Sequence, residues 1–220
     1  GSSRESFLGV VIQYSSSGSE SLTLTLVQST PAARKAVPST DVSVGLLGAG
    51  AFAASTLVPA LKKSAGTALV GVCAASGSHA QHAAGKFSFR YCTTDEAQLI
   101  HDPAINTVVI ATRHHLHARQ VLAALAAGKH VFCEKPLCLS ESDLRSIARA
   151  YLGVASTQRP ALMVGFNRRF APTSGRMESF LAPVSEPLAL HYRINAGYLP
   201  SDHWLHDREQ GGGRILGEVC

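Results

Sequence analysis

The sequence predicts an α/β fold built on a doubly wound parallel sheet over residues 42–165. Short apolar runs of strand length alternate there with segments whose apolar residues recur at helical spacing. The runs are continuously apolar, which is typical of strands that helices cover on both faces. Strands separated by helices pair in parallel through right-handed crossovers, so the alternation itself predicts a parallel sheet.

The expected elements follow one another from residue 42 onwards. Pro59 lies inside the first helix and should kink or shorten it. Gly128 is placed to end the fourth helix, and Ser140 with Asp143 nearly matches a capping box at the start of the fifth. The expected strands are residues 44–47, 68–73, 106–111, 130–133 and 161–165, and the expected helices are residues 51–63, 80–86, 96–101, 117–127 and 140–153.

The residues before this region form a separate segment, residues 1–41. Residues 7–14 (FLGVVIQY) and 21–27 (SLTLTLV) have the pattern of strands, and residues 30–41 have the composition of a linker. Two strands without a partner are marginally stable. They are therefore either the tail of a preceding domain or a flap packed on the following one.

The composition is that of a soluble globular protein, and we expect it in the cytoplasm. Hydrophobic residues make up 45% and charged residues 16% of the 220 residues, which allows a sizeable core. No apolar stretch approaches the ~20 residues of a membrane helix, and the polar residues 1–9 are not a signal peptide. The net charge of +5 is spread along the chain, which argues against a nucleic-acid partner.

Cysteine usage indicates a reducing compartment. The count is odd, and no Cys-x-x-Cys pair is present, so we expect free thiols, most of them buried. The five cysteines are Cys73, Cys92, Cys133, Cys138 and Cys220.

A glycine-rich turn follows the first strand and opens the first helix. Residues 48–53 (GAGAFA) fit the pattern G-x-G-x-x-G/A. Gly48 permits the tight turn, Gly50 lets the backbone approach a pyrophosphate, and Ala53 is small enough for close packing of helix on sheet. Ala51 and Phe52 begin the helix, whose free N–H groups favour phosphate. The pattern predicts binding of NAD or NADP, the alternative being a turn of small residues that binds nothing.

The loop after the second strand leans towards NADP. An acid that binds the ribose should stand there, about 20 residues past the glycine turn. Residues 74–79 (AASGSH) contain neither Asp nor Glu. Ser76, Ser78 and His79 are placed to meet a 2′-phosphate instead, although no arginine follows at once and the loop could simply pack.

Three later stretches resemble the glucose–fructose oxidoreductase / inositol dehydrogenase / MocA (Gfo/Idh/MocA) family. They are residues 112–117 (TRHHLH) followed by 127–136 (AGKHVFCEKP), residues 164–170 (VGFNRRF) and residues 204–213 (WLHDREQGGG). The resemblance covers residues 42–220. It implies a Rossmann domain, residues 42–165, followed by the start of an α+β substrate domain with a mostly antiparallel sheet, residues 166–220.

The resemblance also implies a reaction and the residues that carry it. Family members move hydride between a nicotinamide and a carbon that bears a hydroxyl, commonly on a sugar or polyol. Lys135 is then the active-site lysine, whose ammonium polarises the reacting oxygen or relays its proton. Besides the turn and Ser76, the residues expected at the cofactor are Thr112, Arg113, His114, His117, Glu134 and Lys135, and those expected at the substrate are Asn167, Arg168 and Trp204. We also expect a homo-oligomer.

Two departures concern the ends of the chain. The family's triple glycine is usually followed by an aspartate and then a histidine, but Gly217 stands at the aspartate position, with Glu218 next. The histidine would be the residue after Cys220. We therefore expect a truncated chain that is inactive alone. Residues 7–14 and the linker also resemble bi-domain proteins in which a medium-chain alcohol dehydrogenase module comes first.

Two functions other than a dehydrogenase also fit the sequence, and a metal site is not expected. Histidines gather at residues 114–117 and 203–206, but the family resemblance places them around the cleft, so no metal site is expected. A nucleotide-binding module without chemistry is one alternative, favoured by the missing histidine, whereas Lys135 favours the enzyme. A redox-inactive fragment that oligomerises through a sheet edge is the other.

Overall fold

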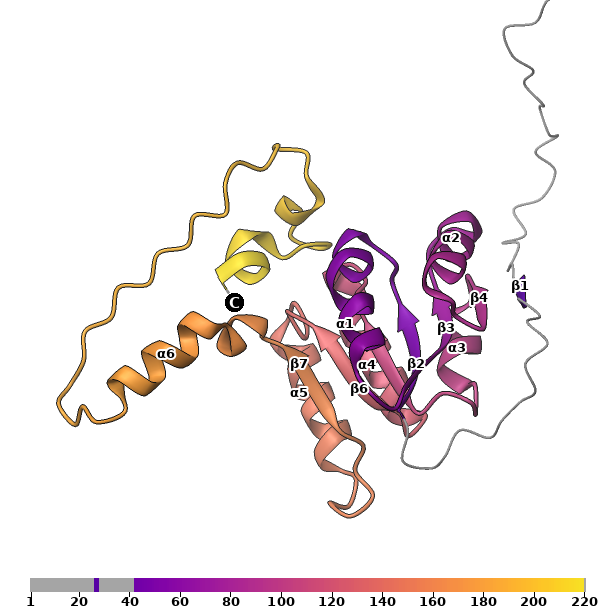
Figure 1. Cartoon of the computed structure of the whole chain (residues 1–220), viewed down its shortest axis with the longest axis horizontal. Helices are drawn as coiled ribbons and strands as arrows, with labels where there is room; N and C mark the ends of the chain where they lie inside the picture. The colour runs from indigo at the N-terminus through magenta and orange to yellow at the C-terminus, as the bar shows by residue number, and fades with distance from the viewer. Residues whose placement is uncertain (1–25, 28–41, 220) are drawn as a thin grey trace, which may run out of the picture.

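The computed structural model describes residues 26–27 and 42–219. They form a seven-stranded sheet in the order β1-β4-β3-β2-β5-β6-β7 (Figure 1). The six strands from β2 to β7 are parallel, and β1 pairs antiparallel with β4 at the edge. The parallel strands have the order of a Rossmann fold, which confirms the doubly wound sheet. The strands are β1 (Leu26–Val27), β2 (Val42–Leu47), β3 (Thr67–Cys73), β4 (Tyr91–Thr93), β5 (Thr107–Ile110), β6 (His130–Glu134) and β7 (Leu162–Gly165).

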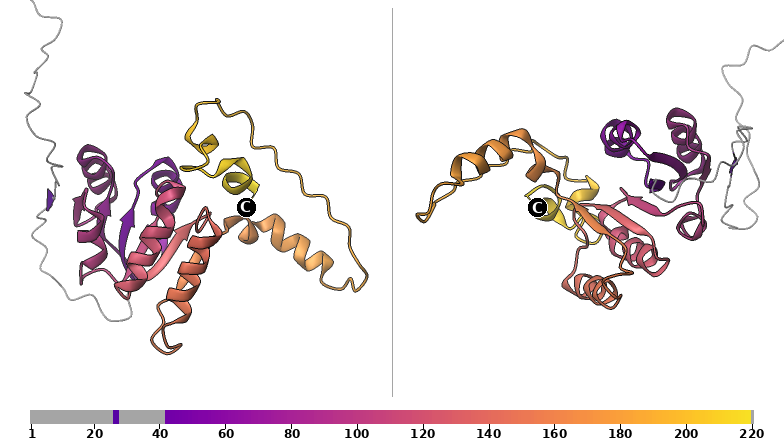
Figure 2. Two further views of the ribbon diagram at one scale, coloured as in Figure 1. Left: turned by 180° about the vertical axis from the view of Figure 1, so that it is seen from behind. Right: turned by 60° about the horizontal axis from the view of Figure 1, so that its bottom comes forward.

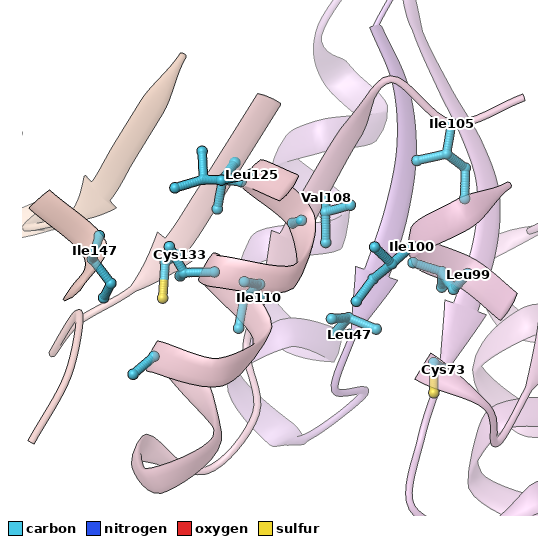
Figure 3. Close-up of a cluster of buried hydrophobic side chains, with 14 of the residues drawn as sticks. Leu47, Cys73, Leu99, Ile100, Ile105, Val108, Ile110, Leu125, Cys133 and Ile147 are labelled. Carbon is cyan, nitrogen blue, oxygen red and sulfur yellow. The ribbon is translucent and has the colours of Figure 1, made fainter. Parts of the chain in front are cut away.

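Helices cover both faces of this sheet (Figure 2). Neighbouring residues of β5 show why its run is continuously apolar. Val109 packs with side chains of α1 and α2. Val108 and Ile110 pack on the other face with side chains of α3, α4 and α5 (Figure 3). The helices are α1 (Val58–Lys63), α2 (Gly77–Phe87), α3 (Glu96–His101), α4 (His114–Ala126), α5 (Glu141–Leu152) and α6 (Pro172–Leu181). No helix of the described ranges is both long enough and apolar enough to cross a membrane.

The segment after the glycine turn is helical over all of residues 51–63, so Pro59 does not shorten it. A π-helical segment, Ala53–Leu57, precedes α1, and Pro59 lies in the first turn of α1. Gly128 follows α4 at φ 69° and donates to the Leu125 carbonyl, and the Ser140 hydroxyl accepts from the Asp143 amide at the start of α5, so both caps are confirmed.

Some element boundaries differ from the sequence expectation. Strand β4 was not predicted, because three residues are too few to show a periodicity. Helix α4 begins at His114 and not at residue 117; Arg113 precedes it without a side-chain cap that would mark the start. Helix α2 begins at Gly77 and not at residue 80, with Ser76 as its N-cap.

The ends of the chain bear on the remaining expectations. Leu26–Val27 pair with Tyr91 and Cys92 of β4, as a flap on the following domain would. The expected strand at residues 7–14 and the linker at 30–41 lie outside the described residues. Described residues 166–219 form α6, short helical turns and extended chain without a strand, so the antiparallel sheet and the boundary at residue 166 stay predictions.

Candidate active site

A cavity of about 1050 Å³ opens where β2, β3, β5 and β6 end. It lies at the point where the chain order reverses between β2 and β5, which is where open α/β sheets bind ligands. It brings together most residues that the sequence singled out. Those that line it are Gly48, Gly50, Ala51, Phe52, Ala53, Thr112, Arg113, His114, His117, Glu134, Lys135, Asn167 and Trp204. Ser76 and Arg168 are not among its lining residues.

The glycine turn forms one wall of the cavity. The Gly48 amide donates to the Cys73 carbonyl at 2.9 Å, and its φ of 92° suits glycine alone. A Cβ at Gly48 would lie 2.5 Å from the Ala111 carbonyl oxygen, whereas a Cβ at Gly50 would meet nothing within 4 Å. Ala53 is 1% exposed beneath the turn. Gly48 is therefore needed for the fold, and Gly50 leaves open space on the cavity side.

The wall beside β3 carries residues of α2 and α3. Ser76 serves as the N-cap of α2, its hydroxyl 3.4 Å from the His79 amide nitrogen, and His79 lines the cavity. Glu96, the first residue of α3, also lines it; its carboxylate accepts from Gln120 at 2.8 Å and pairs with Arg119 at 2.9 Å. Burial raises the pKa of the Cys73 thiol to about 12, and the nearby carboxylate of Glu96 adds to the rise.

Lys135 lies at the opposite wall, just beyond β6. Its ammonium donates to the Gly217 carbonyl, and the Lys135–Pro136 peptide bond is cis. Burial raises the pKa of Glu134, although the Lys135 backbone and charge act in the opposite direction. The structure thus sets a carboxyl and an ammonium side by side at this end of the cavity.

Two histidines of α4 stand between these walls. His114 lies with Nδ1 2.7 Å from the Gly211 carbonyl oxygen, and His117 with Nδ1 2.7 Å from that of Pro136. Burial lowers the pKa of both rings, so both are neutral near neutral pH. His117 is fully buried, so it supports the wall from behind.

The segment that follows Trp204 packs against the mouth of the cavity. The Trp204 ring centroid is 4.9 Å from that of His114, and the Arg113 guanidinium lies 5.8 Å from the Trp204 centroid and donates to the Gln210 side chain. Arg168 is exposed and donates to the Glu218 carbonyl at 2.6 Å. In residues 26–27 and 42–219 no group of three or more His, Cys, Asp or Glu side chains could hold a metal ion.

Sequence reasoning missed two residues that reach the cavity just after β4, Thr94 in the loop and Glu96 at the start of α3. Glu96 and Thr94 line it, yet neither belongs to a recognised motif. The signal was strand β4: carboxyl ends of parallel strands meet at one edge, so recognising β4 would have placed both residues there. The cysteine expectation is confirmed for Cys73, Cys92 and Cys133, which are buried and form no disulfide. Cys138 is half-buried and forms no disulfide either, and Cys220 lies outside the described residues.

Comparisons with known proteins agree with this geometry. The Gfo/Idh/MocA model, an oxidoreductase family with an NAD-binding Rossmann fold, matches residues 42–166. The 1,5-anhydro-D-fructose reductase of Ensifer adhaerens is 28% identical over 181 residues, 80% of this chain and 52% of that protein. The myo-inositol dehydrogenase of Lactobacillus casei, solved with NAD(H) and myo-inositol, is 26% identical with a TM-score of 0.60, covering 65% of this chain and 42% of that one. The biliverdin reductase of Synechocystis sp. PCC 6803, solved with biliverdin and NADP+, is 25% identical with a TM-score of 0.64, covering 81% and 55%.

The share of each chain that is covered decides which conclusions these matches support. The chain spans about half the length of the curated relatives it matches, and the family match alone covers more than half of the chain. This chain therefore belongs to the Gfo/Idh/MocA oxidoreductase family, and residues 42–166 form its NAD-binding Rossmann fold.

Proposed function

We propose that the cavity binds a nicotinamide dinucleotide. We propose also that the whole protein moves hydride between the nicotinamide and a hydroxyl-bearing carbon of a sugar-like or polyol substrate. The observation that carries the proposal is a single cavity with the glycine turn on one wall and Lys135 on another. The open space above Gly50 is a cradle that a side chain would fill, so the residues present fit such a group. Relatives that act on carbohydrates and inositol support the substrate class.

We assign a separate role to each group of cavity residues. Backbone N–H groups of residues 48–53 hold the pyrophosphate at the start of the helix. Thr112, Arg113, His114 and Glu134 lie along the dinucleotide, with His117 behind them. When bound, the nicotinamide supplies the site that gives or takes hydride. Lys135 stabilises the charge that develops on the substrate oxygen, and Asn167 and Trp204 receive the substrate. Arg168, which the sequence resemblance also placed at the substrate, donates to the Glu218 carbonyl outside the cavity lining.

We further propose that NADP is accepted at least as well as NAD. Residues 74–79 carry no acid to repel a 2′-phosphate, and His79 lines the cavity beside them. Replacing His79 by alanine should weaken NADPH binding and leave NADH binding unchanged. A clear preference of the parent chain for NADH, unaltered by this substitution, would contradict the proposal.

The remaining assignments concern the whole protein. We propose that residues 166–220 begin its substrate domain, that a medium-chain alcohol dehydrogenase module precedes this region, and that it is a cytoplasmic homo-oligomer. The pattern of residues 7–14 supports the upstream module. The sequence of the parent gene and sedimentation of the full-length protein test these points directly.

Dinucleotide binding can be tested on the chain itself by titrating NADH and NADPH and following nicotinamide fluorescence. Gly50→Val places a side chain in the open cradle, and it should weaken binding at least about tenfold while leaving the melting temperature unchanged. Gly175→Val on α6 is the matched control, since a Cβ there also meets nothing within 4 Å. Equal affinity of the Gly50→Val variant and the parent would show that the turn is not the phosphate site.

A further inference from the structure

A row of hydrogen-bonded polar side chains lies behind the cavity wall, along α4. The Thr112 hydroxyl donates to Gln120 Oε1 at 2.6 Å, and Gln120 Nε2 donates to Glu96 Oε1 at 2.8 Å. His117 faces two backbone carbonyls, with Nδ1 2.7 Å from Pro136 O and Nε2 3.1 Å from Thr112 O. A neutral imidazole has one N–H and can donate to only one of these carbonyls, and Pro136 is the nearer. The side-chain hydrogen bonds therefore run from Glu96 on α3 to Thr112, and His117 lies in contact between Thr112 and the loop that follows Lys135.

Gln120 has only one orientation that satisfies this row. The carboxylate of Glu96 can only accept, so it must meet the amide nitrogen, and the hydroxyl of Thr112 is then free to donate to the amide oxygen. Gln120 is 0% exposed. Water cannot replace a lost partner at such a position, so breaking either bond leaves a buried polar group unsatisfied.

Each end of the row controls a loop that lines the cavity. The backbone of Ala111 and Thr112 packs directly on the glycine turn, because a Cβ at Gly48 would lie 2.5 Å from Ala111 O and 2.8 Å from Thr112 N. His117 holds the Pro136 carbonyl, one residue beyond Lys135. A shift of Thr112 must therefore move the glycine turn, and a shift of His117 must move the Lys135 loop.

We propose that Gln120 and His117 are positioning residues that hold the glycine turn and the Lys135 loop in one fixed register. Gln120 is fully buried and does not line the cavity, so it acts through Thr112. His117 is fully buried at the cavity wall and acts through Pro136. The consequence for dinucleotide affinity rests on the proposed function. The consequence for the two loops does not, because the bonds exist without a ligand.

The test replaces Gln120 by an isostere. Gln120→Glu keeps the shape but sets a second carboxylate against Glu96. In hydrogen–deuterium exchange without ligand, peptides spanning residues 46–52 and 133–138 should exchange at least about fivefold faster. Gln98→Glu is the matched control: Gln98 is exposed on α3, and its Oε1 accepts from Thr93 at 2.7 Å, a bond that a carboxylate also accepts. Exchange in the control should equal that of the parent.

A reversed pair distinguishes positioning from a general loss of structure. Combining Gln120→Glu with Glu96→Gln again sets one amide against one carboxylate, and the introduced carboxylate still accepts from Thr112. Exchange at both loops should return to the parent rate. NADH affinity should be about tenfold lower in Gln120→Glu than in the unmutated chain. If Gln120→Glu does not fold, Thr112→Val removes the hydroxyl at nearly constant volume and should speed exchange at the glycine turn.

Two results would overturn the inference. The first is unchanged exchange at both loops in Gln120→Glu or, where that variant does not fold, unchanged exchange at the glycine turn in Thr112→Val. The second is faster exchange in Gln120→Glu that the reversed pair does not bring back to the parent rate. Failure of the parent chain to bind either dinucleotide would instead contradict the proposed function, and the exchange rates would still decide the role of Gln120.

Discussion

Replacing Gly48 by alanine isolates the steric demand of the glycine turn. The residue has φ 92°, and a Cβ would lie 2.5 Å from the Ala111 carbonyl oxygen, a distance that real Cβ atoms do not adopt. The left-handed backbone costs alanine about 1–2 kcal/mol. Overpacking against a backbone atom that cannot rotate away adds about 1–3 kcal/mol.

Gly128 provides a control that separates these two costs. It has φ 69°, but a Cβ there would meet nothing within 4 Å, so Gly128→Ala carries the backbone cost alone. A domain of this size loses about 2–4 °C in melting temperature per kcal/mol. We therefore expect Gly128→Ala to melt about 5 °C below the parent and Gly48→Ala about 10 °C below it.

The assay is thermal unfolding of the three proteins followed by circular dichroism at one concentration. Dinucleotide titration of the same samples should show a loss for Gly48→Ala and none for Gly128→Ala, because only the first residue lies in the turn. A Gly48→Ala variant as stable as Gly128→Ala would show that the turn relaxes easily, and the argument from the Ala111 contact would be wrong.

Three further predictions follow from the site. On the proposed function, Lys135→Ala in the whole protein should lower turnover about a hundredfold with little change in dinucleotide affinity. Undiminished turnover would remove Lys135 from the chemistry. Burial lowers the folded-state pKa of His114, which faces His115, His117, Lys135 and Trp204. The unfolded chain therefore binds the proton more tightly, and the free energy of unfolding falls as the pH drops below about 6.5. His114→Gln should flatten the change in urea midpoint between about pH 7.5 and pH 5.5, and an unchanged slope would contradict this. In a Cys220→Ser background at about pH 8, a thiol reagent should modify half-buried Cys138 first and leave Cys73 intact, as read by mass spectrometry, because only thiolates react and the pKa of Cys73 is raised to about 12.

Much of the fold could be predicted from the sequence alone, because it depends on local features of the chain. The continuous apolar runs identified five of the six parallel strands, since burial on both faces leaves no polar positions. Gly128 and Ser140 marked helix ends because their conformational and hydrogen-bonding roles are local. The tight turn at Gly48 and the place of Lys135 after a strand were likewise predicted, because a turn and a strand end depend on short segments of chain.

Only the tertiary structure decided which distant residues share the cavity. Nothing near Glu96 or Gln120 in the sequence indicates that they meet, because residues 24 positions apart are joined by the packing of α3 and α4 on one face of the sheet. It also assigned Ser76 to the N-cap of α2 and Arg168 to the Glu218 carbonyl, away from the cavity lining. Sequence thus determined the elements and the motif within each, since those follow from local geometry and burial. Which side chains become neighbours depends on strand order and helix packing, and these depend on contacts across the whole sheet.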